Sequence, residues 1–153
     1  GRQAAMAVSV AGKILLDTNV FADYLRADLH AERVFGGIKN TIRFLSSIVL
    51  IELRLGADTA KRKRVVQRIV KAFPTTRIVA PTTLLFDLAG CSFRTVYGSI
   101  AEDSDRSAPM NDLLISLTAR EIGATVTTRN LKDFRRIATD VKGLKFSAPE
   151  VNA

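Results

Sequence analysis

Short runs of apolar residues alternate along the chain with segments in which apolar residues recur every three or four positions. The first run, 14–16, ends at small polar residues, and a helical pattern then continues through Val20, Phe21 and Leu25. This pattern predicts a buried strand that leads directly into a helix. Further strands are predicted at 42–45, 77–80 and 124–127, with an edge strand at 144–146. Helices are predicted at 33–39, 48–55, 61–73, 83–97 and 109–122, with a final helix from Leu131.

Strands that alternate with helices form βαβ units, whose strands run parallel in one sheet. We therefore predict the α/β class: a three-layer α/β/α domain with a mainly parallel central sheet of four to five strands. A length of 153 residues suits one domain with a real core. We expect residues 11–153 to form this domain and residues 1–10 to be a flexible lead-in. No run approaches the ~18 apolar residues of a membrane span, so we expect no membrane partner.

The composition narrows the chemistry that is available. The formal net charge of +8 and the isoelectric point near 10.2 favour a polyanionic partner, either nucleic acid or an acidic protein segment. The single histidine, His30, lies in a polar segment that we interpret as an exposed turn, and the single cysteine is Cys91. One of each cannot build a Cys/His zinc site, and one cysteine excludes an internal disulfide and fits the reducing cytoplasm. If the protein is an enzyme, carboxylates must carry its chemistry.

Polar residues follow two of the predicted strands at the point where each strand ends. Asp17 follows the first strand, and Asn130 and Asp133 lie at the junction after 124–127. Because parallel strands place their carboxyl ends on one edge of a sheet, these side chains can converge there. The alternative for Asp17 is a purely structural role as the N-cap of the helix that follows.

Glu52 lies on an apolar face of the predicted helix 48–55. The other residues of this face are Ile48, Ile51 and Leu55. A carboxylate is rarely buried without a partner. The partner is either an arginine, for which Arg54 and Arg129 are the candidates, or a metal ion shared with other acids.

Asp112 is predicted in the first turn of the helix 109–122, with Asn111 as an N-terminal cap. Free backbone N–H groups and the helix dipole favour a negative charge there, so this residue also has a structural explanation. If Asp17, Glu52 and Asp112 meet, however, they repel one another unless a cation is present. Mg²⁺ or Mn²⁺ suits such oxygen ligands, and either ion can activate water and stabilise charge on a phosphoryl group. Whether one ion or two would bind remains open.

Four segments resemble, in the same order, the motifs of the PIN-domain nucleases, and within that family those of the VapC-type toxins of bacterial toxin–antitoxin pairs. These segments are LLDTNV at 15–20, SSIVLIEL at 46–53 with the following Gly56, NDLLIS at 111–116 and TTRNLKDF at 127–134. Each segment is weak alone, but four in order make a specific match that extends from about residue 13 to residue 146.

This resemblance implies a PIN-like fold and a Mg²⁺- or Mn²⁺-dependent endoribonuclease, held inactive by a cognate VapB-type antitoxin that inserts into the active-site groove. By motif match, the acids that bind metal and catalyse are Asp17, Glu52 and Asp112. Family members place a fourth acid at the position of either Asn130 or Asp133, so Asp133 is assigned to it here. Supporting residues are Thr18, Asn19, Thr127 and Asn130, and residues expected to contact RNA are Arg129 and Arg135. The resemblance also implies a homodimer.

Two other functions are weighed against this one. A catalytically silent module of the same fold would use its basic surface to hold RNA or a protein, and the presence of all three main acids disfavours it. A phosphohydrolase of the aspartyl-phosphate kind usually carries Asp-x-Asp after the first strand. The chain has Asp17-Thr18-Asn19, which argues against that class. No motif in the sequence identifies the RNA target or the cut site.

Overall fold

The computed structural model describes residues 12–98 and 105–149, and the predicted lead-in at 1–10 lies outside this range. Within it, five strands form one sheet in the order β3-β2-β1-β4-β5, and all neighbouring strands are parallel. The strands are β1 (Gly12–Leu16), β2 (Thr41–Ser46), β3 (Ile78–Val79), β4 (Thr125–Thr127) and β5 (Lys145–Ser147). The predicted α/β class and parallel sheet are confirmed.

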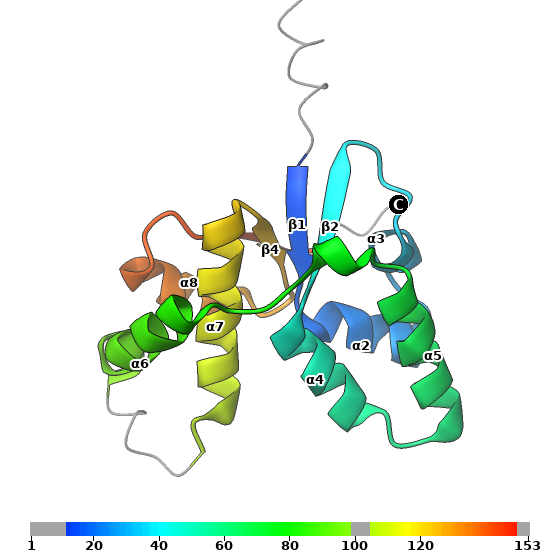
Figure 1. Cartoon of the computed structure of the whole chain (residues 1–153), viewed down its shortest axis with the longest axis horizontal. Coiled ribbons are helices and arrows are strands. Elements are labelled where there is room, and N and C mark those ends of the chain that lie inside the picture. The colour runs from blue at the N-terminus through cyan, green and yellow to red at the C-terminus, as the bar shows by residue number, and fades with distance from the viewer. Residues whose placement is uncertain (1–11, 99–104, 150–153) are drawn as a thin grey trace, which may run out of the picture.

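Helices cover the sheet on both sides. Figure 1 shows α6, α7 and α8 on one side of the strands and α2 to α5 on the other, as the three-layer prediction requires. The helices are α2 (Thr18–Ala27), α3 (Ala31–Phe35), α4 (Ser47–Gly56), α5 (Ala60–Lys71), a 3₁₀ turn η1 (Thr75–Arg77), α6 (Thr83–Tyr97), α7 (Ser107–Ile122) and α8 (Leu131–Asp140). Among the described helices, none combines the length and apolar composition that a membrane crossing requires.

The central strand β1 fixes the position of the first motif. Leu15 and Leu16 are fully buried because helices pack on both faces of the sheet. In the strand register Leu16 is paired with Thr127, so β1 and β4 end at the same level. The chain therefore leaves both strands at one edge of the sheet, where it places Asp17 next to Thr128.

Helix α4 buries a different face from the predicted one. Val49 and Leu53 are buried, whereas Ile51 and Leu55 are 54% and 78% exposed. Six of its ten residues are large and apolar, and the consecutive run 48–51 places apolar side chains on every side, so the sequence pattern does not determine which side faces the core. Contacts with α2, α5 and α7 set the orientation instead. Glu52, which the sequence placed on the buried stripe, is half-buried at the border of the packed face.

Helix α7 begins at Ser107, before the predicted start at residue 109. The carboxylate of Asp105 accepts hydrogen bonds from the backbone N–H and the hydroxyl of Ser107, at 3.0 and 2.6 Å. Pro109 fits in the first turn because N–H groups there have no helical partner to lose. Asp112 therefore lies in the second turn, and Asn111 lies inside the helix instead of capping it. The prediction of a first-turn aspartate was wrong, so the helix dipole does not explain Asp112.

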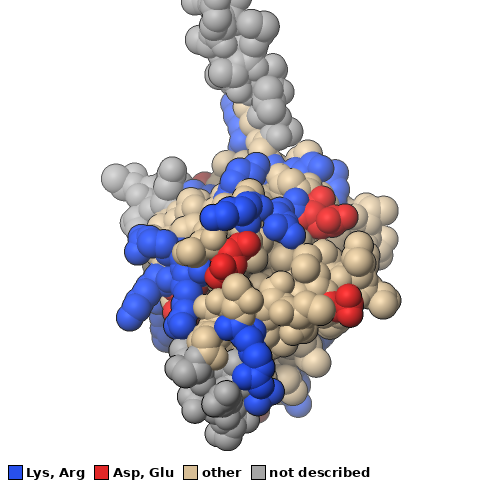
Figure 2. All heavy atoms as spheres, turned by 90° about the vertical axis from the view of Figure 1, so that its left-hand side faces the viewer, with Lys and Arg blue, Asp and Glu red and all other residues tan. Residues whose placement is uncertain are grey.

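Basic side chains are spread over more than one face. Figure 2 shows lysines and arginines on the face that carries α6 and α8. The exposed basic residues of α8 are Lys132, Arg135 and Arg136, and those that open α5 are Lys61, Arg62, Lys63 and Arg64. Because α5 and α8 lie on opposite sides of the sheet, the positive charge does not by itself mark a path for RNA.

Candidate active site

Asp17 connects β1 to α2 and is held in place on several sides. Its backbone N–H donates to the carbonyl of Thr127 at 2.9 Å, which ties the end of β1 to β4. Its Oδ1 accepts the N–H of Thr18 at 2.8 Å, so Asp17 does cap α2. Its Oδ2 accepts the Thr128 hydroxyl at 2.8 Å and the Asn19 amide at 3.2 Å. The capping role accounts for one carboxylate oxygen only, and the other is fixed by side chains from two motifs.

The environment of Asp17 works against its negative charge. The residue is 5% exposed, and this burial raises its pKa above the ordinary value of 3.8. Hydrogen bonds from Thr128 and Thr18 lower the pKa, while the nearby charge of Glu52 raises it. The hydrogen bonds orient the carboxylate, while burial and Glu52 disfavour its charge, so a metal ion beside it would be favourable.

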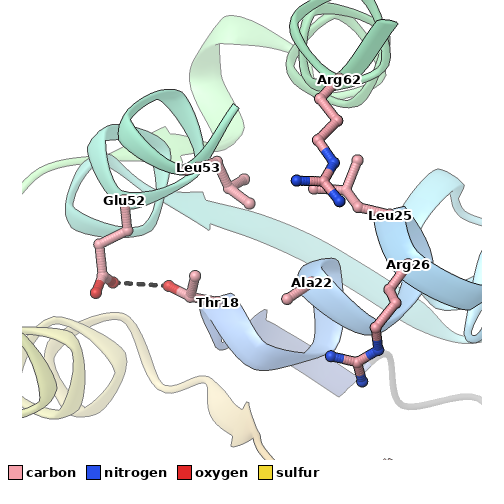
Figure 3. A pocket seen from close by; sticks show the side chains of 8 residues that line it. Thr18, Ala22, Leu25, Arg26, Glu52, Leu53 and Arg62 are labelled. Carbon is pink, nitrogen blue, oxygen red and sulfur yellow. Dashed lines mark hydrogen bonds between the residues drawn. The ribbon is translucent and has the colours of Figure 1, made fainter. Parts of the chain in front are cut away.

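Glu52 reaches the same region from helix α4. Its Oε1 accepts the hydroxyl of Thr18 at 2.7 Å (Figure 3). The two arginines considered as its ion-pair partners bond elsewhere: Arg54 donates to Gln67 at 2.7 Å, and Arg129 donates to Asp23 at 2.6 Å. The interpretation of Glu52 as half of an ion pair with either arginine was therefore wrong.

Asp112 is the residue on which the acidic groups act most strongly. Its pKa is raised to about 7, first by burial and then by the charges of Asp17, Asp133 and Glu52. These three groups lie at the junction of β1 and α2, on α8 and on α4, so the fold brings each of them within electrostatic range of Asp112. A carboxyl group with such a pKa is about half protonated at neutral pH when no cation is bound.

The fourth acidic position lies at the start of helix α8. Asp133 is exposed in the first turn of this helix, and its Oδ2 accepts the side-chain amide of Asn130 at 2.6 Å. The backbone N–H of Asn130 donates in turn to the hydroxyl of Thr128 at 2.9 Å. Asn130 thus links Asp133 to the residue that holds Asp17, in agreement with a supporting role.

Thr128 joins the first and last motifs, although no role was predicted for it from the sequence. It is fully buried, and its hydroxyl donates to Asp17 while it accepts from Asn19 and Asn130. The neighbouring Thr127, which was predicted as a supporting residue, contributes its backbone carbonyl. The signal for Thr128 was present, because a small polar residue directly follows a predicted strand, as Asp17 does.

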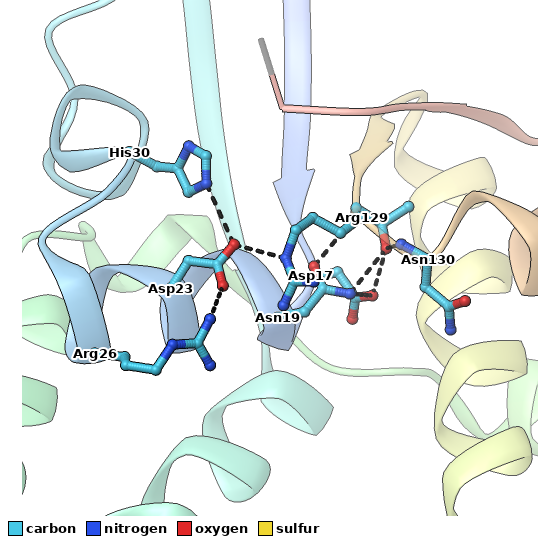
Figure 4. Close-up of polar contacts among 8 residues, drawn as sticks. Asp17, Asn19, Asp23, Arg26, His30, Arg129 and Asn130 are labelled. Carbon is cyan, nitrogen blue, oxygen red and sulfur yellow. Dashed lines mark hydrogen bonds and ion pairs between the residues drawn. The ribbon is translucent and has the colours of Figure 1, made fainter. Parts of the chain in front are cut away.

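A second buried acid, Asp23, was also missed. It is 3% exposed and contacts the arginines at 26 and 129 and His30 (Figure 4). The side chain of His30 is only 9% exposed, so the prediction of a histidine in an exposed turn was wrong. The signal for Asp23 was an acidic residue that follows Val20 and Phe21 on the face of α2 that turns toward the core.

The donor set suits a hard divalent cation, although it is not closed around one. Within residues 12–98 and 105–149, no three acidic, histidine or cysteine side chains lie close enough together to hold a metal ion as placed. The mutual repulsion that raises the pKa of Asp112 is nevertheless the effect that a bound cation would relieve.

A pocket of about 230 Å³ opens next to Thr18 and Glu52 (Figure 3). Its other lining residues are Ala22, Leu25, Arg26, Leu53, Gly56 and Arg62. The lining thus combines aliphatic side chains with two arginines and the carboxylate of Glu52.

Comparisons with known proteins agree with this geometry. A model of the PIN domain family matches residues 14–140, a stretch that contains all four acids. Over 128 residues the chain is 31% identical to Ribonuclease VapC2 of Rickettsia felis, a match that covers 80% of this chain and 90% of that protein.

Solved structures show the same fold. VapBC2 from Rickettsia felis, bound to a DNA fragment from its promoter, matches with a TM-score of 0.61 and 26% identity, covering 90% of this chain and 99% of that chain. VapBC-1 from nontypeable Haemophilus influenzae matches with a TM-score of 0.64 over 89% of this chain and 97% of that chain. Its identity of 22% supports the fold alone.

Proposed function

The chain belongs to the PIN domain family and to its VapC-type ribonucleases, and from this premise we propose that it is a Mg²⁺- or Mn²⁺-dependent endoribonuclease toxin controlled by a VapB-type antitoxin. The observation that carries the proposal is the electrostatic coupling of Asp112 to Asp17, Glu52 and Asp133. Four acids from four separate segments have no evident structural reason to share one region, whereas a divalent cation at that place would stabilise all of them.

In this proposal Asp17, Glu52, Asp112 and Asp133 hold the metal. The ion supplies, when bound, an activated water and stabilisation of the charge on the scissile phosphate. The protein contributes orientation: Asn19 and Thr128 fix one oxygen of Asp17, and the Thr18 hydroxyl holds Glu52.

The raised pKa of Asp112 couples binding of a cation to release of a proton. At neutral pH this carboxyl group holds a proton part of the time, so cation binding releases that proton. The basic side chains Arg129 and Arg135 are assigned to the RNA backbone, because both are exposed and lie on the segment that follows β4.

Partners follow from the family and from the surface. The similar structure from Rickettsia felis is a VapBC complex, which supports an antitoxin partner for this chain, and we place both in the cytoplasm. A homodimer is supported by large apolar side chains that the isolated chain leaves exposed on α4 and α6. These residues are Ile51, Leu55, Leu84 and Phe86.

One observation favours the alternative, a catalytically silent RNA- or protein-binding module. The described acids do not form a ready-made metal site. A protein of this kind would bind RNA through its basic surface but would leave the RNA intact with any divalent cation.

Cleavage of a mixed RNA pool by the purified chain separates the two. We expect fragments with Mg²⁺ or Mn²⁺, none with EDTA, and at least a 100-fold loss of rate for Asp17→Asn, since the substitution removes a charged ligand from the site. Asp87→Asn, at an exposed position on α6, is the matched control and should cleave like the wild type. Intact RNA under all conditions, with no change in melting temperature on adding either metal, would favour the binding module.

A further inference from the structure

Beside the four acids lies a cluster of polar side chains, of which the proposed function uses only Arg129. It consists of Asp23, Arg26, His30 and Arg129, and we call it the Asp23 cluster. One Asp23 oxygen accepts the Nε of Arg129 at 2.6 Å and lies 3.4 Å from the His30 ring, and the other accepts a terminal nitrogen of Arg26 at 2.8 Å (Figure 4). We propose that Asp23 positions Arg129 and Arg26 as a clamp for RNA backbone phosphates next to the site of cleavage. This inference rests on the proposed ribonuclease function.

Arg129 is held through one side of its guanidinium. Asp23 engages the Nε side of its guanidinium, and among the described residues the terminal nitrogens of Arg129 have no further hydrogen bond. Half of the side chain remains exposed. A guanidinium anchored in this way presents two parallel N–H donors to the solvent, an arrangement that matches the oxygens of a phosphate.

The Asp23 cluster contains more positive than negative charge. Two arginines share one carboxylate, so the three groups together carry a net positive charge. The carboxylate is 4% exposed, whereas the side chains of Arg26 and Arg129 are 67% and 50% exposed. The negative charge is therefore buried beneath two cations that face outward. An ion pair that served stability alone would need one arginine, and the second adds an anion-binding surface.

Hydrogen bonds through Asn19 connect the Asp23 cluster to the acids. The backbone N–H of Arg129 donates to the Asn19 Oδ1 at 3.1 Å, and the Nδ2 of Asn19 donates to Asp17 at 3.2 Å. Arg26 lines the pocket that also contains Thr18 and Glu52. The two arginines thus lie beside the acidic site, where we expect the phosphates that neighbour the scissile one to bind.

Binding of a fluorescent single-stranded RNA oligonucleotide in EDTA tests the clamp without any need for cleavage. We expect Arg129→Ala and Arg26→Ala each to weaken binding about 10-fold at low salt, as for the loss of a charged hydrogen bond. Each should also lower the slope of log affinity against log salt by about 0.7, the value for one phosphate contact on a single strand. Arg120→Ala is the control, because it removes the same charge at the end of α7 that lies away from Asp112. The Arg120 side chain donates there to the carbonyl of Lys142.

Substitution of Asp23 distinguishes positioning from simple charge. Asp23→Asn removes a negative charge near the RNA, so electrostatics alone predicts tighter binding. Loss of positioning predicts weaker binding, with a salt slope like that of Arg129→Ala and partial recovery in Asp23→Glu. Melting temperatures identify variants that are merely unfolded, and in that case the arginine variants decide the question.

Three results would overturn the clamp: wild-type protein without affinity for RNA, arginine variants with the salt slope of Arg120→Ala, or a folded Asp23→Asn that binds RNA more tightly. Wild-type protein that binds RNA through these arginines but does not cleave it would refute the proposed nuclease and leave the clamp standing.

Discussion

The hydroxyl of Thr18 donates to Glu52 at 2.7 Å and so connects two motifs that lie 34 positions apart in the chain. Thr18 is also the first residue of α2, and its N–H donates to the capping carboxylate of Asp17. One residue therefore contacts two of the four acids, the first through its backbone and the second through its side chain.

Replacing Thr18 by valine should reduce RNA cleavage by about 10-fold or more, because a hydrogen bond to a charged group contributes about 1.5–3 kcal/mol. The backbone bond to Asp17 is unaffected by this change, so the melting temperature should move little. Thr18→Ser retains the hydroxyl and should restore most of the rate. Equal rates for the valine and serine variants would show that the orientation of Glu52 does not matter.

Asp112 makes the stability of the metal-free protein depend on pH. The unfolded chain releases this proton near the ordinary pKa of 3.8, whereas the folded protein retains it to about 7. The folded state holds more protons between these values, so its stability should fall as the pH rises from about 4 to 7. Asp112→Asn should flatten this decline and raise the melting temperature at pH 8 by about 3 °C or more.

Divalent cation should counteract the same repulsion. We expect Mg²⁺ or Mn²⁺ to raise the melting temperature of the wild type at pH 8 and to have a much smaller effect on Asp112→Asn, measured by scanning calorimetry. An equal increase in both proteins would mean that the ion binds elsewhere.

The identity of the fourth acid can be tested by exchange. Asp133→Asn should lower the cleavage rate about 10-fold, less than Asp17→Asn. The reason is that Asp133 is the exposed one of the four acids, so its charge is the most screened by water. The double variant Asn130→Asp with Asp133→Asn moves the acid to the other position that the family uses, and should recover part of the rate. No loss in the single variant would leave a site of three acids.

The exposed apolar residues on α4 and α6 predict self-association. Leu55 and Leu84 are 78% and 73% exposed, and a double Leu→Glu variant should convert a dimer to a monomer in light-scattering measurements. Leu29→Glu is the control, since Leu29 is 49% exposed in the turn between α2 and α3 and belongs to neither α4 nor α6. Unchanged mass in the double variant would place the dimer contact on another surface.

The sequence predicted the features that depend on local pattern. Apolar runs that end in polar residues correctly located β1 and β4, and hence Asp17 and the segment after Thr127. The face of α4 could not be predicted, because a helix with apolar side chains on several sides fits the core in several rotations and only its neighbours select one.

The individual side-chain contacts of Asp23 could not be predicted from the sequence. The partner of Asp23 is Arg129, which lies 106 positions away, and neither residue alone indicates the other. The start of α7 was misplaced for a related reason. Pro109 suggested the first residue of a helix, whereas the side chain of Asp105 stabilises an earlier start.

The hydrogen bond between Thr128 and Asp17 spans 111 positions of the chain. During synthesis Asp17 leaves the ribosome early, but the strand and hydroxyl that hold its carboxylate emerge only after most of the domain has been made. A nascent chain that ends before residue 128 cannot assemble the site. For the nuclease proposed above, this order of motifs would delay cleaving activity until late in translation, when an antitoxin already present in the cell could bind the protein as it folds.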